Sequence, residues 1–411
     1  MDGRLPDWIS IGVLTASIPR DVVDEAITAC GKQAQRCDGK LPPHVMVYFA
    51  MAMALFADDD YEEVLTRLAE PLSRWGCWND EWEMPGSSGI TQARQRIGPE
   101  PLKRIFEEVC QPVAEELTRG AWLAGRRLVS VDGFEWDAPD TPANVAAFGY
   151  DGGKGHPSAF PKVRVLSLVE SASHAVFGAA MGPSGGKGSG ERSLARHLLP
   201  LLDETMILLA DRGFYSFEGW CAAADTDAGL LWRVGENLHL PPVADLKDGS
   251  YTSVVFAARV RAGERDRILA DARAGRQIDP DRARIVRVAE YEVTNRGASD
   301  SPETIRLLST ILDPVEVPAG LLAQTYHDRW EHEGSNDELK THLRGPGRIL
   351  RSQSPDLVRQ EIYGYLLTHH AISALICQAA TEADLDPDRV KFLRTVRLVR
   401  RRIADPAAFS P

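Results

Sequence analysis

Two short apolar segments of this chain stop abruptly at an aspartate. Residues 128–131 are followed by Asp132, and residues 206–210 are followed by Asp211. Apolar runs of this length are typical of buried strands, and helix patterns lie between and after them, which predicts a mixed α/β sheet. A carboxylate at the end of a buried strand lies where α/β folds commonly bind ligands. An aspartate is also common in simple turns, so each one alone is weak evidence.

Composition favours a globular chain inside the cell. Of 411 residues, 44% are hydrophobic and 26% are charged, which fits a folded chain with a sizeable core. The longest apolar stretch, residues 45–57, is too short to span a bilayer, and the first ten residues lack the features of a signal peptide. The six cysteines form no CxxC pair and no zinc-finger spacing, so we expect reduced thiols and no membrane association.

The charge distribution is uneven. The net charge of -12 at first argues against a nucleic-acid partner, and residues 1–120 carry 20 acidic and 12 basic residues. In contrast, residues 389–402 carry seven basic residues and no acidic one. This basic segment also has apolar residues at a spacing of three, so it is a candidate both for DNA contact and for docking as an amphipathic helix.

A polar stripe marks one face of a helix predicted in the last third of the chain. At about 100° per residue, Tyr326, Arg329, Glu333 and Lys340 fall within a stripe about 60° wide. One carboxylate between cations suits a metal ion beside a phosphate backbone. Asp337 lies near the same stripe and is a rival acid, and a solvated helix with charge pairs four residues apart is the structural alternative.

The spacing Tyr-x2-Arg-x3-Glu-x6-Lys resembles the signature of the insertion-sequence-4 family of DDE transposases. The segments VSVDG and LLADRGF resemble the first and second aspartate regions of that family, and SSGITQARQRIG resembles part of its N-terminal domain. The likeness extends from about residue 5 to residue 380. The four-residue signature is specific, whereas each aspartate segment alone is not.

The resemblance implies an RNase H-like catalytic core that is interrupted by a β-strand insertion. The 122 residues between Asp211 and Glu333 are too many for a compact core without one, and the strand-rich, arginine-rich block near residues 230–315 supplies it. The expected parts are a helical N-terminal domain (1–122), the first part of the core (123–228), the β-rich insertion (229–316), the second part of the core with the glutamate helix (317–385) and a basic tail (386–411).

The resemblance also implies the chemistry. Asp132, Asp211 and Glu333 would hold two Mg²⁺ or Mn²⁺ ions, typically about 3.5–4 Å apart. Water would cut the phosphodiester at the element end, and the freed 3′-hydroxyl would attack target DNA in an in-line transesterification. By analogy with the family, Lys340 and Arg329 bind phosphate near the cleaved end.

Tyr326 would position the DNA by the same analogy. The expected partners are double-stranded DNA, as terminal inverted repeats and as target, and a second copy of the chain in a homodimer on DNA. The expected location is the cytoplasm, in association with the nucleoid.

Two other functions remain open from the sequence. One is an RNase H-like DNA nuclease that cuts without strand transfer, and the other is an inactive, domesticated DNA-binding protein. The intact aspartates and helix signature argue against decay. The acidic N-terminal part leaves the DNA-reading surface undefined, and the helix with Arg94 and Arg96 is the best candidate. His369 and His370 lie on an apolar helix and are interpreted as core histidines.

Overall fold

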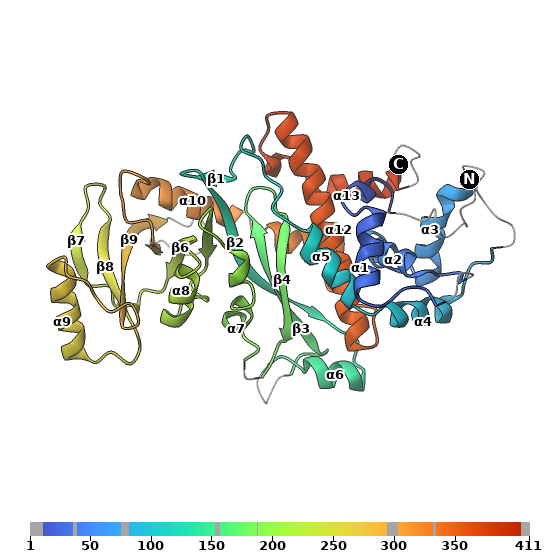
Figure 1. Ribbon diagram of the computed structural model, residues 1–411, viewed down its shortest axis with the longest axis horizontal. Helices are drawn as coiled ribbons and strands as arrows, with labels where there is room; N and C mark the ends of the chain where they lie inside the picture. Colours follow the sequence, from blue (N-terminus) through green and yellow to red (C-terminus); the bar gives the residue numbers. More distant parts are fainter. Residues whose placement is uncertain are drawn as a thin grey trace.

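The computed structural model describes residues 11–35, 39–74, 82–152, 157–186, 188–293, 303–331 and 334–403, without the side chains of 71–74, 329–331 and 334. Figure 1 shows an elongated molecule in which a central sheet separates a helical end from a strand-rich end. Among the described residues, no helix has the length and apolar character needed to cross a membrane.

The helical end is built around one completely buried helix. The N-terminal helices are η2 (Gly12–Ala16), α1 (Arg20–Ala29), α2 (Pro43–Leu55), α3 (Tyr61–Arg74), α4 (Ser87–Ile97) and α5 (Glu100–Val109). Every residue of α2 from His44 to Leu55 is buried, because α2 is apolar on all sides and the long helix α12 (Pro355–Glu382) covers it. Gly364 of α12 lies so close to the Ala50 carbonyl that a Cβ would clash. The first and last thirds of the chain therefore share one core.

The strands form one mixed sheet. They are β1 (Trp122–Leu123), β2 (Arg126–Asp137), β3 (Lys162–Glu170), β4 (Val176–Pro183), β5 (Met206–Ala210), β6 (Gly229–Val234), β7 (Pro242–Asp245), β8 (Tyr251–Phe256), β9 (Ala283–Val293) and β10 (Glu303–Ser309). Their order is β4-β3-β2-β5-β6-β10-β9-β8-β7, with β1 paired to β2. β2, β3 and β4 are antiparallel, and β5 and β6 run parallel to β2. The first five strands of that order have the arrangement of an RNase H-like sheet, which confirms the predicted fold class.

The expected strand insertion continues the edge of this sheet. β10 pairs antiparallel with β6, and β9, β8 and β7 follow in antiparallel order beyond it. Helix α9 (Ala262–Arg273) packs against this part at the strand-rich end of the molecule (Figure 1). The insertion therefore lengthens the core sheet instead of forming a separate one.

The remaining helices are α6 (Pro142–Phe148), α7 (Glu191–Ala195), η3 (Leu199–Leu201), α8 (Phe217–Ala224), α10 (Ala319–Glu331), α11 (Gly334–Asp337), η4 (Glu338–Leu343), η5 (Pro387–Arg389) and α13 (Phe392–Arg402). Among them, α10 and η4 carry described residues of the polar stripe, and α13 packs at the helical end. The segment η4 is π-helical, so the angle of 100° per residue assumed from the sequence does not hold beyond Glu338. Short π-helical segments are frequent at functional sites.

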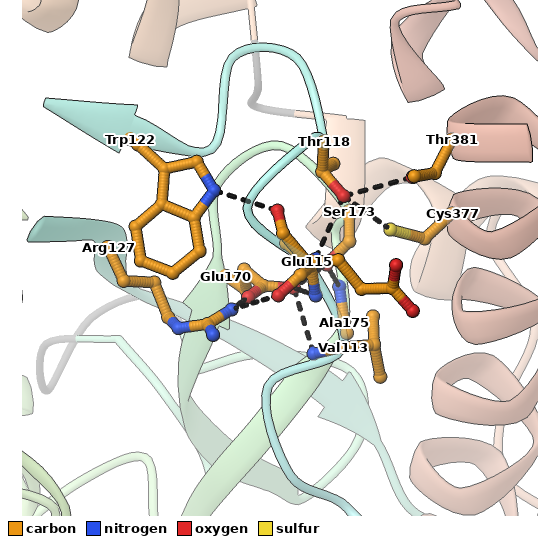
Figure 2. Close-up of polar contacts among 11 residues, drawn as sticks. Val113, Glu115, Thr118, Trp122, Arg127, Glu170, Ser173, Ala175, Cys377 and Thr381 are labelled. Atoms are coloured by element: carbon orange, nitrogen blue, oxygen red, sulfur yellow. Dashed lines mark hydrogen bonds and ion pairs between the residues drawn. The ribbon is translucent and has the colours of Figure 1, made fainter. Parts of the chain in front are cut away.

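A buried glutamate fixes the connection between the helical end and the sheet (Figure 2). Glu170, at the end of β3, accepts hydrogen bonds from the backbone N–H groups of Val113 at 3.0 Å and Ala114 at 2.9 Å. Its carboxylate also accepts from Arg127 and Ser173. Because these donors surround a fully buried carboxylate, they compensate its loss of hydration. The sheet thereby holds the linker that leaves α5.

Helix α12 holds the same linker from the other side (Figure 2). The Thr118 hydroxyl lies 2.9 Å from the Thr381 hydroxyl and 4.0 Å from the Cys377 sulfur. The Trp122 indole donates to the Glu115 carbonyl at 2.9 Å. The linker is thus anchored to both the sheet and α12, which gives the helical end a fixed attachment to the core.

Candidate active site

The two aspartates that follow apolar runs, Asp132 and Asp211, lie at the same height along neighbouring strands of the sheet. Every residue pair between β2 and β5 has the same offset, from Arg127 with Met206 to Ser130 with Leu209. Asp132 and Asp211 continue this offset just past the last paired residues. The expectation that the first strand ends at Asp132 is wrong, because β2 continues to Asp137 through its pairing with β3, whereas Asp211 directly follows the last residue of β5. Neighbouring strands lie about 4.8 Å apart, so the constant offset places the two aspartates side by side, just past the parallel pairing. The structure therefore brings together the two acids that the sequence selected separately.

Asp132 is held by contacts on several sides. Its Oδ1 accepts from the backbone N–H of Gly133 at 2.8 Å, and its backbone carbonyl accepts from the Ser167 hydroxyl at 3.3 Å. Its Oδ2 accepts from the side-chain amide of Asn336 in α11 at 2.5 Å. These bonds fix the orientation of a half-buried carboxylate. Sequence reasoning missed Asn336, although it lies three residues after Glu333 in the signature helix.

Asn336 itself is only partly satisfied. Its side chain is buried, and its Oδ1 has no hydrogen-bond partner among the described residues. A buried amide oxygen without a partner is costly, and in a functional site it often marks the place of a ligand, ion or water. This oxygen lies on the amide that anchors Asp132, so it belongs to the same site.

Asp211 contacts the first residue of the signature. The Tyr326 hydroxyl donates to Asp211 Oδ1 at 3.5 Å, and the Tyr326 ring is fully buried in a core with residues of β5 and β6. The predicted role of Tyr326 was to position DNA. In the structure its hydroxyl faces a catalytic candidate instead of solvent.

A third carboxylate, Glu191, lies against Gly133 and is influenced electrostatically by both aspartates. Glu191 begins α7, directly after the glycine-rich loop, and its carboxylate packs against Gly133, where a Cβ would clash with it. Burial raises the pKa of Glu191, Arg164 opposes this, and Asp132 and Asp211 raise the pKa further. Gathered carboxylates repel one another, and a divalent cation would relieve that repulsion. No sequence pattern marks Glu191 beyond its place at a predicted helix start.

The donor set fits a hard divalent metal ion. Carboxylate and amide oxygens are the ligands that Mg²⁺ and Mn²⁺ prefer. Within the described ranges, no three His, Cys, Asp or Glu side chains converge closely enough to hold a metal ion. The predicted third ligand, Glu333, lies outside the described residues. The described part of the site thus supplies oxygen donors from β2 and β5 and leaves the third ligand a prediction.

Of the two predicted phosphate-binding cations, the structure describes the side chain of Lys340 but not that of Arg329. The Lys340 ammonium, on η4, lies 5.9 Å from the ring centroid of Phe134, two residues beyond Asp132 on β2. Arg329 belongs to α10, but its side chain lies outside the described residues. Lys340 therefore stays beside the strand that carries Asp132, despite the change to π-helical geometry.

The rival acid Asp337 does not join this group. Its side chain is 57% exposed, lies 3.6 Å from His342 and accepts a hydrogen bond from Thr341. Its neighbour Asn336, not Asp337, contacts Asp132. The geometry thus disfavours Asp337 as a metal ligand.

A buried charged cluster supports the helix behind the site. Glu338 of η4 lies 3.2 Å from His174 and 3.1 Å from His369, and His174 lies 3.2 Å from Asp388. The Nδ1 atom of His369 is buried without a described partner, which fits a neutral ring that donates from Nε2 to Glu338. His370 contacts the Val176 carbonyl at 3.1 Å. Both α12 histidines are buried, which confirms their interpretation as core residues.

Opposing effects set the pKa values in this cluster. Burial raises the pKa of Glu338, but hydrogen bonds from His174 and His369 outweigh it and lower the pKa to about 2. Burial lowers the pKa of His174, but hydrogen bonds to Asp388 and Glu338 outweigh it and raise the pKa to about 10. At neutral pH the cluster therefore holds an ionised glutamate against a protonated histidine.

The proposed DNA-reading role of Arg94 is wrong. Arg94 is fully buried and donates to the Gln360 side chain at 2.8 Å, the Tyr61 hydroxyl at 2.6 Å and the Ser352 hydroxyl at 2.9 Å. Arg94 links α4 to α12, and its side chain has no exposed surface with which to contact a base pair. Only Arg96 of that arginine pair is exposed.

Comparison with known proteins agrees with this arrangement. Residues 8–107 match the family described as insertion element 4 transposase N-terminal, and residues 123–369 match the transposase DDE domain. The transposase InsG for insertion sequence element IS4 of Escherichia coli (strain K12) is 28% identical over 378 residues, which cover 90% of this chain and 78% of the relative. The putative transposase InsZ of the same strain is 30% identical over 131 residues, which cover 31% of this chain and 42% of the relative.

A solved piggyBac transposase synaptic complex with hairpin DNA is 10% identical, with a TM-score of 0.47, and the match covers 96% of this chain and 80% of that one. The two family matches follow one another along the chain and together include both aspartates and the whole helix signature. The chain belongs to the insertion-sequence-4 family of DDE transposases.

Proposed function

We propose that Asp132, Asp211 and Glu333 form the catalytic centre of this DNA transposase. The observation that carries the assignment is the constant offset between β2 and β5, which Asp132 and Asp211 continue. Asp132 within β2 and Asp211 directly after β5 form a rigid pair of oxygen donors, because the surrounding sheet fixes the backbone beside both.

Asn336 supports Glu333 as the third acid. Asn336 lies three positions after Glu333 in the sequence and donates to Asp132. The contact brings α11, the segment that directly follows Glu333, beside the first aspartate. By contrast, Asp337 is exposed and contacts its own helix.

The proposed cofactor is a pair of Mg²⁺ or Mn²⁺ ions. Bound between the three acids, the ions would supply an activated oxygen nucleophile and stabilise the charge on the leaving oxygen. Asn336 and Gly133 would keep Asp132 in position, and Tyr326 would do so for Asp211. We therefore propose that Tyr326 acts on the DNA through Asp211 and not by direct contact.

The proposed reaction has two steps at phosphorus. Water forms a new P–O bond at the element end, and the bond to the 3′-oxygen breaks to leave a 3′-hydroxyl. That hydroxyl then attacks a phosphodiester of the target DNA, and the target 3′-oxygen leaves. Lys340 and Arg329 are proposed to bind the phosphates beside the reacting one, where cations offset the charge of the backbone.

The proposed DNA partners are the terminal inverted repeats and a target duplex. Joining two element ends requires that both be held together, so we propose a homodimer on DNA. Its proposed place of action is the cytoplasm, at the nucleoid.

A cleavage and strand-transfer assay tests the assignment. The substrate is DNA from the flanks of this gene that carries candidate inverted repeats, incubated with the full-length protein and Mg²⁺ or Mn²⁺. We expect nicking at the repeat boundary and joined product, and a loss of about 10³-fold in Asp132→Asn, Asp211→Asn and Glu333→Gln. Asp337→Asn is the matched control and should remain active.

Each other outcome points to a different function or acid. Cleavage without joining would indicate a nuclease, and binding without cleavage would indicate a domesticated DNA-binding protein. If Glu333→Gln stays active and Asp337→Asn does not, the third acid is Asp337 and not Glu333.

A further inference from the structure

We infer that the exposed face of α13 is a binding surface for the DNA phosphate backbone, placed beside the helix that carries the transposase signature. This inference rests on the proposed function, because it takes duplex DNA as the substrate. The sequence left two roles open for the basic segment, DNA contact and docking as an amphipathic helix, and the structure is compatible with both at once.

Helix α13 has two faces of opposite character. Its buried apolar face consists of Phe392, Val396, Val399 and Ile403 just past its end. Arg394, Arg397 and Arg401 are exposed and recur at intervals of three and four residues, on the opposite side of an ideal helix. Lys391 is exposed at the N-terminal boundary of the helix, and Leu398 is 50% exposed beside the arginines.

The apolar face fixes the direction of the basic face. α13 packs against α12, η4 and η2, close to the N-terminal helices at one end of the molecule (Figure 1). The backbone of Ile403 lies against Gly12, where a Cβ would clash. A tethered tail could turn its charges in any direction, whereas this docked helix holds a row of arginines in one orientation.

The basic row forms no ion pair with any acidic residue that the structure describes. Among the described residues, none of Lys391, Arg394, Arg397 or Arg401 forms an ion pair. Like charges three or four residues apart destabilise a helix, so the row has an energetic cost in the free protein. A polyanionic ligand would offset that cost. The concentration of unpaired cations is notable in a chain whose net charge is -12.

The acids nearest to this face have partners elsewhere. A groove of about 530 Å³ lies between η4 and α13, and its lining includes Asp337 and Asp388 as well as Arg394 and Arg397. Asp337 lies 3.6 Å from His342. Asp388 lies 3.2 Å from His174, whose pKa is raised to about 10, so the ring is protonated at neutral pH. Asp388 is thus already compensated by His174, and Asp337 shares the groove with Arg394 and Arg397 but forms no ion pair with either among the described residues.

The location links the row to the active site. η4 contacts α13 on one side, and on the other its Lys340 lies over Phe134 of β2, two residues from Asp132. A strand that leaves the catalytic acids along η4 would reach α13 next.

The chemistry of the row suits phosphate. Arginine presents a planar fork of donors that matches phosphate oxygens. Positions 394 to 401 cover about 10 Å of helix, the length of about three nucleotide steps along one strand.

The salt dependence of DNA binding tests this inference in the full-length protein. Binding to a fluorescent duplex is measured over a potassium chloride series in EDTA, so that no cleavage occurs. The variant is Arg394→Gln/Arg397→Gln/Arg401→Gln. The matched control, Lys103→Gln/Arg104→Gln/Arg119→Gln, removes the same charge from exposed cations that already have acidic partners. Circular dichroism and thermal unfolding verify that both variants are folded.

We expect the α13 variant to bind more weakly and with a flatter salt dependence. Each phosphate contact contributes about 0.9 to the slope of log K against log salt, so three lost contacts flatten the slope by about 2.7. The control should keep the wild-type slope. An unchanged slope in the α13 variant, or equal changes in both variants, would overturn the inference and leave the proposed function intact. If the wild-type protein bound no duplex, both would fail.

Discussion

Asn336 donates a hydrogen bond from its side-chain amide to the carboxylate of Asp132, across 204 residues of sequence. This bond joins β2, the strand of the first proposed catalytic acid, to α11 in the segment that resembles the transposase signature. Metal sites depend on such supporting hydrogen bonds, because a carboxylate that is free to rotate binds a cation less well. The amide oxygen of Asn336 is buried and has no hydrogen-bond partner among the described residues, and it belongs to the same side chain that contacts Asp132.

Replacing Asn336 by alanine should weaken metal-dependent cleavage by about 10- to 100-fold, because Asp132 would lose its anchor. The loss should be greatest at low Mn²⁺ and partly recover at high Mn²⁺. Cleavage rates over a Mn²⁺ titration measure this effect. Thr341→Ala, on the neighbouring segment η4, is the control and should keep the wild-type metal dependence. A rate that falls equally at all Mn²⁺ concentrations would contradict the anchoring role.

Local patterns explain why part of the site was predictable. Asp132 and Asp211 each follow a short apolar run, and both signals lie within a few residues, although β2 continues past Asp132 to Asp137 and only β5 ends before its aspartate. Asn336 and Glu191 reach the site through contacts between distant segments, and neither has a local pattern that marks it. Tertiary packing also explains why Arg94 is buried and not available to DNA, because the local sequence does not show that α12 covers it.

The fold was predictable for a similar reason. Strand-length apolar runs and the change from helical to strand patterns are local, and they gave the fold class. The π-helical segment that begins at Glu338 was not predictable, because no periodicity in the sequence marks it, nor does any mark the contacts of Glu338 with His174 and His369.

The variants Tyr326→Phe and Tyr326→Ala should distinguish the contribution of the Tyr326 hydroxyl to cleavage from the contribution of its ring to stability. The phenylalanine variant keeps the buried ring and loses a hydrogen bond of 3.5 Å to Asp211, so we expect normal stability and a cleavage loss below about tenfold. The alanine variant leaves a cavity and should lose about 3–5 kcal/mol of stability. Thermal unfolding and single-turnover cleavage measure the two effects. Wild-type stability in the alanine variant would contradict the burial of the ring.

Arg94→Met should destabilise the protein and leave its DNA preference unchanged. The substitution leaves the buried polar groups of Gln360, Ser352 and Tyr61 without their donor, which costs about 3–5 kcal/mol. Lysine should not restore stability, since it lacks the forked donors. Urea unfolding measures the loss, and Arg96→Ala, on the exposed side of α4, should stay within about 0.5 kcal/mol of wild type. A change of sequence preference in a stable Arg94→Met protein would restore the DNA-reading role.

The cluster of Glu338 and His174 should give a stability contribution that depends on pH. The pKa of Glu338 is lowered from 4.5 to about 2, so its contribution is complete above pH 4.5 and is lost as the pH falls toward 2. The pKa of His174 is raised from 6.5 to about 10, so its contribution is complete below pH 6.5 and is lost as the pH rises toward 10. The cluster therefore stabilises the fold most between about pH 4.5 and pH 6.5.

Unfolding midpoints of the wild type and of Glu338→Gln/His174→Gln, compared from pH 3 to pH 10, measure this contribution. The gap between the two proteins should be widest near pH 5–6 and should narrow toward both ends, because the variant lacks the two shifted groups. Asp384→Asn removes one partner of an exposed ion pair with Arg119 and should show no such profile. A gap that stays constant with pH would mean that packing alone, and not the charge on Glu338 and His174, holds η4 against α12.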